Sequence, residues 1–464
     1  MSTRHSKAAA EYLRNEVVVE RHDKTFFGVR EKRDRMAHDL PEWEALREAA
    51  DNIKRHTETH LAEYLEQFEA NAKKNGVHVH WAADADEYNR IVLDILQSHD
   101  VRKVVKSKSM LTEECHLNEN LEANGVEVIE TDLGERILQM MHLAPSHIVM
   151  PALHVHREQI GDCFREQIPG TEDNNDPTYL THVARLHLRQ QFMEAGAGMT
   201  GCNFGIAATG DVVVCTNEGN ADMSTSIPKL HIVSMGIEKL VPDYQSVAVF
   251  QRLLARCGTG QETTVYTSHF RGSRPGGEMH IVLVDNGRSR IIGNPEHWQT
   301  LKCMRCGACM NTCPVYRRSA GYSYTYFIPG PIGVNLGMLK DKDKYYDNLS
   351  ACSLCCSCDN VCPVRVDLSH QIYRWRQELD SLGHADRMKK LISGGMKFLF
   401  SHPALYVNTL KMSKVVNMMP DWLVNSKLNP WAYGHETFKF PKESFHVQWK
   451  KGLPPTPSQR GGAE

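Results

Sequence analysis

The sequence predicts an α/β plus α fold, in which an α/β domain is followed by a smaller helical domain that binds metal. Two observations carry this prediction. Between about residues 76 and 290, short apolar runs alternate with helix-like stretches, the βαβ pattern of a largely parallel sheet covered by helices. Nine of the 14 cysteines then fall between residues 303 and 362, and such clustering indicates metal chemistry rather than disulfide bonds.

The first 75 residues are expected to be helical. They are highly charged, and from Glu42 to Lys74 the apolar residues recur at three- and four-residue steps, which is the stripe of an amphipathic helix.

The elements of the α/β region follow from the same reading of apolar periodicity. The expected strands are Val77–Trp81, Val101–Val105, Val126–Ile129, Val212–Cys215, His231–Ser234, Thr263–Thr267 and Met279–Val284. The expected helices are Asp84–Leu96, Met110–Asn124, Tyr179–Glu194 and Tyr244–Arg256. A further helix is expected at Met338–Leu349, between the two halves of the cysteine cluster.

Composition shifts along the chain divide it into four segments. They are an N-terminal helical segment (1–75), an α/β domain (76–295), a helical cluster-binding domain (296–382) and a C-terminal helical segment (383–464). The last segment carries Met and aromatic residues that form either its own core or a docking surface for a partner, namely Met396, Phe398, Phe400, Met412, Met418, Met419 and Trp422.

Composition also excludes some classes of protein. The 54 Lys and Arg residues against 56 Asp and Glu residues give a net charge of −2, which provides no footprint for nucleic acid or an anionic membrane. No stretch approaches the ~18 uninterrupted apolar residues of a membrane helix. The first residues hold no sustained apolar run, so no signal peptide is expected and a cytoplasmic location is predicted.

The cysteine cluster contains one spacing twice. Cys303, Cys306, Cys309 and Cys313 precede Pro314 in the pattern C-x2-C-x2-C-x3-C-P, and Cys352 opens a second copy that ends at Pro363. This is the spacing of two-cluster ferredoxins, in which three cysteines hold one [4Fe–4S] cluster and the fourth ligates the other cluster.

The spacing therefore predicts two [4Fe–4S] clusters with crossed ligation. The first is assigned to Cys303, Cys306, Cys309 and Cys362, and the second to Cys352, Cys355, Cys358 and Cys313. The alternative is structural zinc, which usually pairs two separate C-x2-4-C motifs rather than two triples. Cys356 lies inside the second run as a spare and is expected to pack rather than to ligate.

Three other patterns suggest ligand sites. Gly196–Gly201 matches G-x-G-x-x-G, but a helix is expected before it and strands after it, the wrong context for a dinucleotide site. His154 and His156 would share one face of a strand, although no carboxylate completes a metal-binding pattern. Glu218 follows an expected strand and is either a substrate-positioning carboxylate or a solvated loop acid.

A fourth pattern is Lys106, Ser107, Lys108 and Ser109, which follow a strand and open a helix. Hydroxyl groups, lysines and free N–H groups at that place form an anion or substrate site. The alternative is a helix N-cap at Ser109 with two surface lysines.

Several passages of the sequence together resemble the lactate utilization protein B family, the iron–sulfur subunit of a bacterial system that oxidises L-lactate. The resemblance covers roughly residues 40–460. It rests on both cysteine runs and on KSKSMLTEE (Lys106–Glu114), ETDLGERI (Glu130–Ile137) and TGDVVVCTNEGNAD (Thr209–Asp222).

The resemblance implies a fold, partners and a role. The α/β region would share the fold of ribose-5-phosphate isomerase, glucosamine-6-phosphate deaminase and CoA transferases, and the cysteine region would be a helical ferredoxin domain. The family works beside a cysteine-rich subunit resembling those of heterodisulfide reductases, and beside a smaller protein that shares this α/β domain. Glu218 faintly resembles the catalytic glutamate of CoA transferases, but its neighbours depart from that loop, so no catalytic residue is assigned.

The expected function is that of an electron-transfer subunit in the oxidation of L-lactate to pyruvate, active only with its partner proteins. The chain has no well-placed flavin or nicotinamide motif, so another cofactor or subunit would carry the bond-breaking step. The alternatives are an α/β domain that acts as an enzyme on a phosphorylated, CoA-linked or carboxylate ligand, and a binding module whose clusters sense oxidation.

Overall fold

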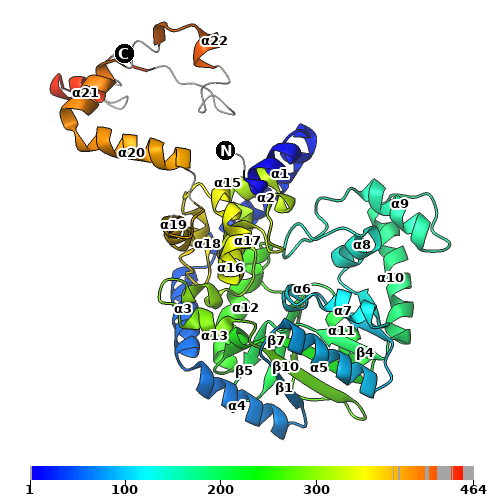
Figure 1. Cartoon of the computed structure of the whole chain (residues 1–464). Helices are drawn as coiled ribbons and strands as arrows, with labels where there is room; N and C mark the ends of the chain where they lie inside the picture. The colour runs from blue at the N-terminus through cyan, green and yellow to red at the C-terminus, as the bar shows by residue number, and fades with distance from the viewer. Residues whose placement is uncertain are drawn as a thin grey trace, which may run out of the picture. The chain divides into compact units, whose positions relative to one another are not determined.

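The structure is a computed structural model that describes residues 3–379, 381–384, 387–412, 417–425, 440–441 and 443–452. The chain divides into two compact units, Met1–Leu382 and Gly383–Glu464 (Figure 1). The first unit contains both β-sheets and the cysteine-rich region, and therefore every candidate site.

The N-terminal segment is helical, as predicted. Its helices are α1 (Arg4–Tyr12), α2 (Glu16–His38), α3 (Trp43–Thr59) and α4 (Leu61–Lys74). Helix α2 packs on the cysteine-rich region, whereas α4 packs on the sheets. The segment thus links the two domains that follow it in the chain.

The main sheet is six-stranded and parallel throughout. Its spatial order is β1 (His78–Ala82), β10 (Glu278–Val284), β7 (Leu230–Gly236), β4 (Ala197–Thr200), β2 (Lys103–Lys106) and β3 (Glu127–Glu130). The strand β7 is buried along its whole length, which explains why its residues are mainly apolar and do not alternate with exposed polar ones. This sheet confirms the α/β prediction.

A second sheet of four short strands lies beside the first. Its order is β8 (Leu240–Val241), β5 (Phe204–Ile206), β6 (Asp211–Thr216) and β9 (Tyr266–Phe270). The expected strand at Thr263–Thr267 is displaced to β9, because Tyr266–Phe270 is the stretch that pairs antiparallel with β6. The G-x-G-x-x-G string is mostly strand β4 and follows a helix, as expected from its neighbours.

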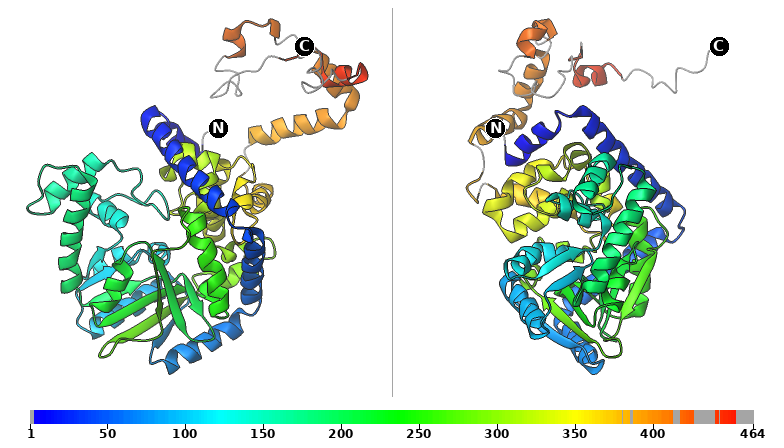
Figure 2. Two further views of the ribbon diagram at one scale, coloured as in Figure 1. Left: turned by 180° about the vertical axis from the view of Figure 1, so that it is seen from behind. Right: turned by 90° about the vertical axis from the view of Figure 1, so that its right-hand side faces the viewer.

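Helices cover the sheet, and a helical arm containing α8, α9 and α10 extends on one side of it (Figures 1 and 2). The α/β helices are α5 (Ala85–Ser98), α6 (Met110–Glu114), α7 (Leu117–Ala123), α8 (Leu133–Met141), α9 (Arg157–Gln167), α10 (Pro177–Glu194), α11 (Asn220–Ser226), α12 (Tyr244–Gly258) and α13 (Arg288–Ile292). The single helix expected over Met110–Asn124 is two helices, because His116 adopts a left-handed conformation with φ of 54°. His154 and His156 lie in a turn region rather than a strand, so that prediction is wrong.

The cysteine-rich region is built from short helices and contains no β-strand within residues 296–379. Its elements are η2 (Trp298–Lys302), α14 (Ala308–Thr312), α15 (Pro314–Ser319), η3 (Gly321–Ser323), α16 (Gly330–Lys340), α17 (Lys342–Tyr345), η4 (Tyr346–Ala351), α18 (Ser357–Val361) and α19 (Leu368–Glu378). The helix expected at Met338–Leu349 is instead divided among the end of α16, which starts at Gly330, the short helix α17 and the 3-10 helix η4. Nearly all of α16 is buried, so it lacks the amphipathic stripe that identifies a helix in sequence.

The second unit contains α20 (Arg387–Ser401), α21 (Pro403–Met412), α22 (Asp421–Val424) and α23 (Phe445–Lys450). Among the described residues of this unit, the large apolar side chains are mostly exposed, with Met418 at 83% and Trp422 at 75% exposure. The side chain of Met412 lies outside the described residues. Among the described residues, every helix is too short or too polar to cross a bilayer.

Candidate metal centre and adjoining cavity

The first cysteine group draws on both runs. Cys303, Cys306 and Cys309 surround the start of α14, and Cys362 reaches them from the end of α18. All four line one small cavity in the core of the helical region. Burial, and then the charges of the other three sulfurs, raises the pKa of Cys309 well above its usual value.

The second group has the reciprocal composition. Burial raises the pKa of Cys313 to about 11, with additional contributions from Cys352 and Cys355 of the second run. Cys358 interacts with Cys313 and Cys352, and also with Cys309 of the first group. The structure therefore brings together the sets of four that the spacing predicts, and it places the two sets side by side.

The spacing of the sulfurs within each group does not fit zinc. A tetrahedral zinc ion bound at about 2.3 Å would hold its sulfurs about 3.8 Å apart. Among the described residues, no three cysteine sulfurs lie within 4.8 Å of one another. Neither group therefore has the preformed spacing of a zinc site, and two adjoining sets of four thiols fit two clusters of iron and sulfide.

The two runs share one backbone conformation. Arg305 and Leu354 occupy equivalent positions, both have positive φ angles (61° and 54°), and each donates its amide to the first sulfur of its run. The N···S distances are 3.4 Å to Cys303 and 3.3 Å to Cys352. Amide donors to sulfur stabilise thiolate charge and adjust the reduction potential of a bound cluster. Two further amides donate to the fourth cysteines, Tyr316 to Cys313 (3.5 Å) and Val366 to Cys362 (3.2 Å).

Positive charge surrounds both groups, and part of it comes from the N-terminal helices. Arg47 of α3 donates to the Cys362 carbonyl at 3.0 Å, and Arg33 of α2 donates to the carbonyl of Val361 at 3.2 Å. In the second group, Arg376 of α19 donates to the Cys352 carbonyl. Buried thiolates need such compensation, because an unpaired buried charge is costly. Sequence reasoning missed Arg33 and Arg47 because they lie more than 300 residues before the cysteines they serve.

Two other cysteines near the groups differ from what the sequence suggests. Cys257 of α12 is fully buried and interacts with the Cys306 thiol, whose pKa it raises together with burial, an interaction that nothing in the spacing indicates. Cys356 is exposed, so the expectation that it packs is wrong. Its position follows from its left-handed backbone, with φ of 59°, at the N-cap of α18.

A cavity of about 370 Å³ separates the α/β domain from the first cysteine group. On one side it is lined by residues at or beyond the carboxyl ends of parallel strands, including Ser107 after β2, Gly201 after β4 and Gly236 of β7. This edge of a parallel sheet is where α/β folds hold ligands. The opposite wall includes Arg305 and Cys306 of the first cysteine run. Any occupant of the cavity therefore lies against the first cysteine group.

The four residues of the predicted anion motif do not all lie at the cavity. Ser107, Lys108 and Ser109 line the cavity, whereas Lys106 does not. The Lys106 amino group is fully buried and paired with Glu130 at 2.7 Å, so it neutralises buried carboxylates inside the fold. The inclusion of Lys106 in an anion site is therefore wrong.

The remaining members of the motif point to a polar ligand. Ser107 is buried and its hydroxyl has no hydrogen-bond partner. Lys108 is not a surface lysine, because its side chain is only 21% exposed and lies 3.6 Å from Asp132. Ser109 is the N-cap of α6, so its oxygen already accepts a bond from the amide of Thr112.

Glu218 lines the same cavity and faces the motif. Its carboxylate accepts a hydrogen bond from the amide of Leu133 at 3.3 Å, at the start of α8. Burial, together with the nearby charge of Asp132, raises the pKa of Glu218 to about 7. A carboxyl group that changes charge near neutral pH inside a cavity is suited to binding or releasing a proton.

The floor of the cavity is a fixed ion-pair network. The Nε of Arg288 donates a hydrogen bond to Glu238 at 2.6 Å. Its two terminal nitrogens donate to the two carboxylate oxygens of Glu114 at 3.0 and 2.9 Å. Although burial opposes ionisation, Arg288 and its cationic neighbours lower the pKa of Glu238 to about 2. Arg305 differs, because one of its buried guanidinium nitrogens has no hydrogen-bond partner. Arg305 is therefore a cation that can bind an anionic ligand, and it lines both this cavity and the small cavity of the first cysteine group.

Comparison with known protein families assigns both the α/β region and the cysteine-rich region to a domain family. Residues 65–292 match the LUD domain family, and residues 299–366 match the 4Fe-4S dicluster domain family. The chain is thus an iron–sulfur protein that joins a LUD domain to a helical dicluster domain.

Proteins that are similar over most of the chain identify one family within this class. It is 43% identical over 376 residues to lactate utilization protein B of Shouchella clausii, covering 79% of each chain. It is 40% identical over 414 residues to the uncharacterized electron transport protein YkgF of Escherichia coli, covering 87% of this chain and 85% of that protein. A crystal structure of a DUF162 family protein from Deinococcus radiodurans aligns with 48% of this chain and 98% of that one, at 14% identity and a TM-score of 0.28. The chain belongs to the lactate utilization protein B family.

Proposed function

We propose that this chain is the iron–sulfur electron-transfer subunit of a multi-protein system that oxidises L-lactate to pyruvate. The observation that carries the proposal is the pair of adjoining four-cysteine groups, each completed by a cysteine from the other run. The names of the relatives, lactate utilization protein B and an electron transport protein, support it.

In this proposal the first [4Fe–4S] cluster is held by Cys303, Cys306, Cys309 and Cys362, and the second by Cys352, Cys355, Cys358 and Cys313. When bound, the two clusters supply two one-electron carriers, which matches the two electrons released by lactate. The protein fixes the thiols, donates amides to their sulfurs and supplies Arg33, Arg47 and Arg376 against their charge.

The surroundings of the two groups support different duties. Cys306 forms part of the cavity wall, so the first group is the one that senses an occupant of the α/β domain. Cys355 of the second group is exposed, so this group is the one that an external redox protein can approach. The partners proposed are a cysteine-rich subunit resembling those of heterodisulfide reductases and a smaller protein with the same α/β domain.

The decisive experiment is anaerobic preparation of the full chain, followed by addition of L-lactate with and without the partner proteins. We expect about eight iron atoms and eight acid-labile sulfides per chain, with reduction by lactate only when the partners are present. A cluster ligated by four cysteines has no open iron for substrate, so the chain alone should remain oxidised. Stoichiometric zinc without sulfide, or rapid reduction of the lone chain, would overturn the proposal.

A second function is supported by the cavity. Lys108, the unpartnered hydroxyl of Ser107 and the unpartnered nitrogen of Arg305 favour a small anionic ligand, such as a carboxylate or a phosphorylated or CoA-linked compound. The α/β domain would then act on that ligand or report its presence to the clusters.

The test of this second function is Lys108→Met, with Lys74→Met as a matched control on the exposed end of α4. We expect at least tenfold weaker binding of L-lactate or phosphate in the first variant only, with iron content unchanged in both. Equal binding by all three proteins would remove Lys108 from the site.

A further inference from the structure

A cluster of histidines and one glutamate lies far from both cysteine groups, at the free edge of the main sheet. The edge strand β1 pairs in parallel with β10, and their register sets His78 directly beside His280. Glu278 precedes His280 by two residues, so both side chains project from the same face of the sheet. His78 and Glu278 open their strands, which puts the cluster at the amino ends of the strands and opposite the cavity.

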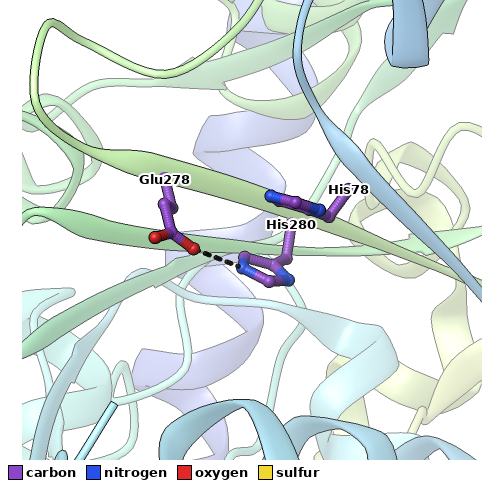
Figure 3. A group of neighbouring side chains, drawn as sticks. All are labelled: His78, Glu278 and His280. Carbon is purple, nitrogen blue, oxygen red and sulfur yellow. Dashed lines mark ion pairs between the residues drawn. The ribbon is translucent and has the colours of Figure 1, made fainter. Parts of the chain in front are cut away.

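The three side chains converge on a common point (Figure 3). One ligand atom from each of His78, Glu278 and His280 lies within 4.8 Å of the other two. The two imidazole rings stack with centroids 4.7 Å apart, and Nε2 of His280 is 3.6 Å from the Glu278 carboxylate. Two histidines and one carboxylate form a common ligand set for zinc and related ions.

The buried histidine has an unsatisfied nitrogen aimed into this cluster. His280 is only 7% exposed, and its Nε2 has no hydrogen-bond partner. Its other nitrogen, Nδ1, is hydrogen-bonded to Nε2 of His80 at 3.0 Å. If Nδ1 of His280 is the donor, Nε2 carries a bare lone pair that faces a carboxylate. If His80 is the donor, the Nε2–H lies too far from Glu278 for a hydrogen bond. In both tautomers this nitrogen lacks a partner, and only the first tautomer can bind a metal.

The neighbours of the cluster act as the supporting groups that such a site needs. A metal-binding histidine usually donates its second N–H to another group, and His80 is in place to accept it from His280. His99, at the end of α5, holds the Glu278 carboxylate at 3.1 Å. Because zinc bonds of 2.0–2.2 Å place ligand atoms about 3.4 Å apart, the three ligands must close by roughly 1 Å. His78 and Glu278 are exposed, so their side chains can adjust by this distance, while burial fixes His280.

We propose that His78, Glu278 and His280 bind one divalent transition-metal ion of the zinc type, with His80 and His99 as positioning residues. Imidazole nitrogens favour such an ion over magnesium or calcium, which take oxygen ligands. The fourth position is left to water. The ion would link β1 to β10, so its role is to stabilise the edge of the sheet and not to take part in ligand binding at the cavity. The site depends on neither the iron–sulfur clusters nor the proposed role in lactate oxidation.

The test uses the full chain with its iron–sulfur clusters intact, so that the cysteines are occupied. The protein is incubated anaerobically with Zn²⁺, freed of excess metal and analysed for zinc content and by X-ray absorption at the zinc edge. The double variant His78→Gln/Glu278→Gln removes two exposed ligands without disturbing the core. The variant His182→Gln/Glu166→Gln, on the exposed faces of α10 and α9, is the matched control.

We expect the wild type and the control to retain one zinc ion per chain with only nitrogen and oxygen ligands. The double variant should bind zinc at least tenfold more weakly and lose the rise in Tm that zinc gives the wild type. Equal zinc binding by the double variant, sulfur in the first coordination sphere, or no retained zinc in the wild type would each overturn the proposal.

Discussion

The two cysteine runs have the same spacing and the same loop conformation but lie in different surroundings. In the first run Cys306 and Cys309 are buried and the loop faces the cavity of the α/β domain. In the second run Cys355 and Cys356 are exposed. Spacing therefore fixes which backbone conformation holds the sulfurs, whereas the neighbouring elements fix what each group can contact.

The difference is sharpest at one equivalent pair of residues. Gly307 and Cys356 both follow the second cysteine of their runs, and both have positive φ angles of 82° and 59°. A Cβ on Gly307 would approach Val149 at 3.1 Å and His147 at 3.2 Å. The second run accepts a side chain at this place because Cys356 is exposed, with its sulfur beside the Ser369 hydroxyl at 3.4 Å. The same turn is thus sterically closed in one run and open in the other.

The largest effects are expected from the crossing cysteines. Cys313→Ser should remove the cluster held by the second triple, and Cys362→Ser the cluster held by the first, because in the proposed assignment each run supplies the fourth ligand of the other. Each variant should keep about four of eight iron atoms, with a different cluster signal lost in each by electron paramagnetic resonance. If each variant instead lost the cluster of its own triple, the crossed assignment would fail.

A smaller effect should separate the equivalent turn residues. Gly307→Ala combines a strained left-handed backbone with contacts to Val149 and His147, so we expect it to lower the free energy of unfolding by about 1–3 kcal/mol. Cys356→Ala, which makes the same alanine at the same place in the other run, should change it by less than about 0.5 kcal/mol. Chemical denaturation of the two cluster-loaded variants measures both. Equal losses would show that the surroundings of the two turns do not differ.

The role of the cavity beside the first cysteine run can be tested by measuring how ligand binding depends on pH. Because the pKa of Glu218 is raised to about 7, the group is neutral below that pH and negatively charged above it. Binding of a carboxylate such as L-lactate should therefore weaken about fivefold between pH 7 and pH 8, through repulsion by ionised Glu218. Calorimetry on wild type and Glu218→Gln checks this, since the variant should bind equally at both values. A pH dependence that survived in the variant would assign it to another group.

The smallest effect concerns Cys356 itself. Cys356→Gly relieves the left-handed strain of a residue with a side chain, so we expect a gain in unfolding free energy of up to about 1 kcal/mol with both clusters retained. Loss of iron in this variant would show that Cys356 is a ligand after all. Iron analysis and denaturation on the same preparation distinguish the two results.

Sequence reasoning succeeded where the signal is local. The cysteine spacing, the alternation of β2 and β3 with their helices, and the mainly apolar sequence of β7 each identify a structure within a few residues. It misplaced α16, because the helix is apolar on every side and contains three glycines. It grouped Lys106 with Lys108, although one points into a buried carboxylate cluster and the other into the cavity. Arg33, Cys257 and the His280 cluster depend on contacts between distant parts of the chain, which no local pattern records.

The hydrogen bonds that Arg33 and Arg47 donate to the cysteine-rich region have a consequence for the order in which the protein folds during synthesis. These arginines leave the ribosome early, yet the carbonyls that they bind belong to Val361 and Cys362, 328 and 315 residues later. At 5–20 residues per second, the N-terminal helices wait roughly 15–60 s for these partners. The first cysteine group is complete only after the α/β domain and Cys362 have been synthesised. Under the proposed ligation, iron and sulfide can complete the first cluster only after residue 362 has been synthesised, and a product truncated before Cys362 cannot hold that cluster.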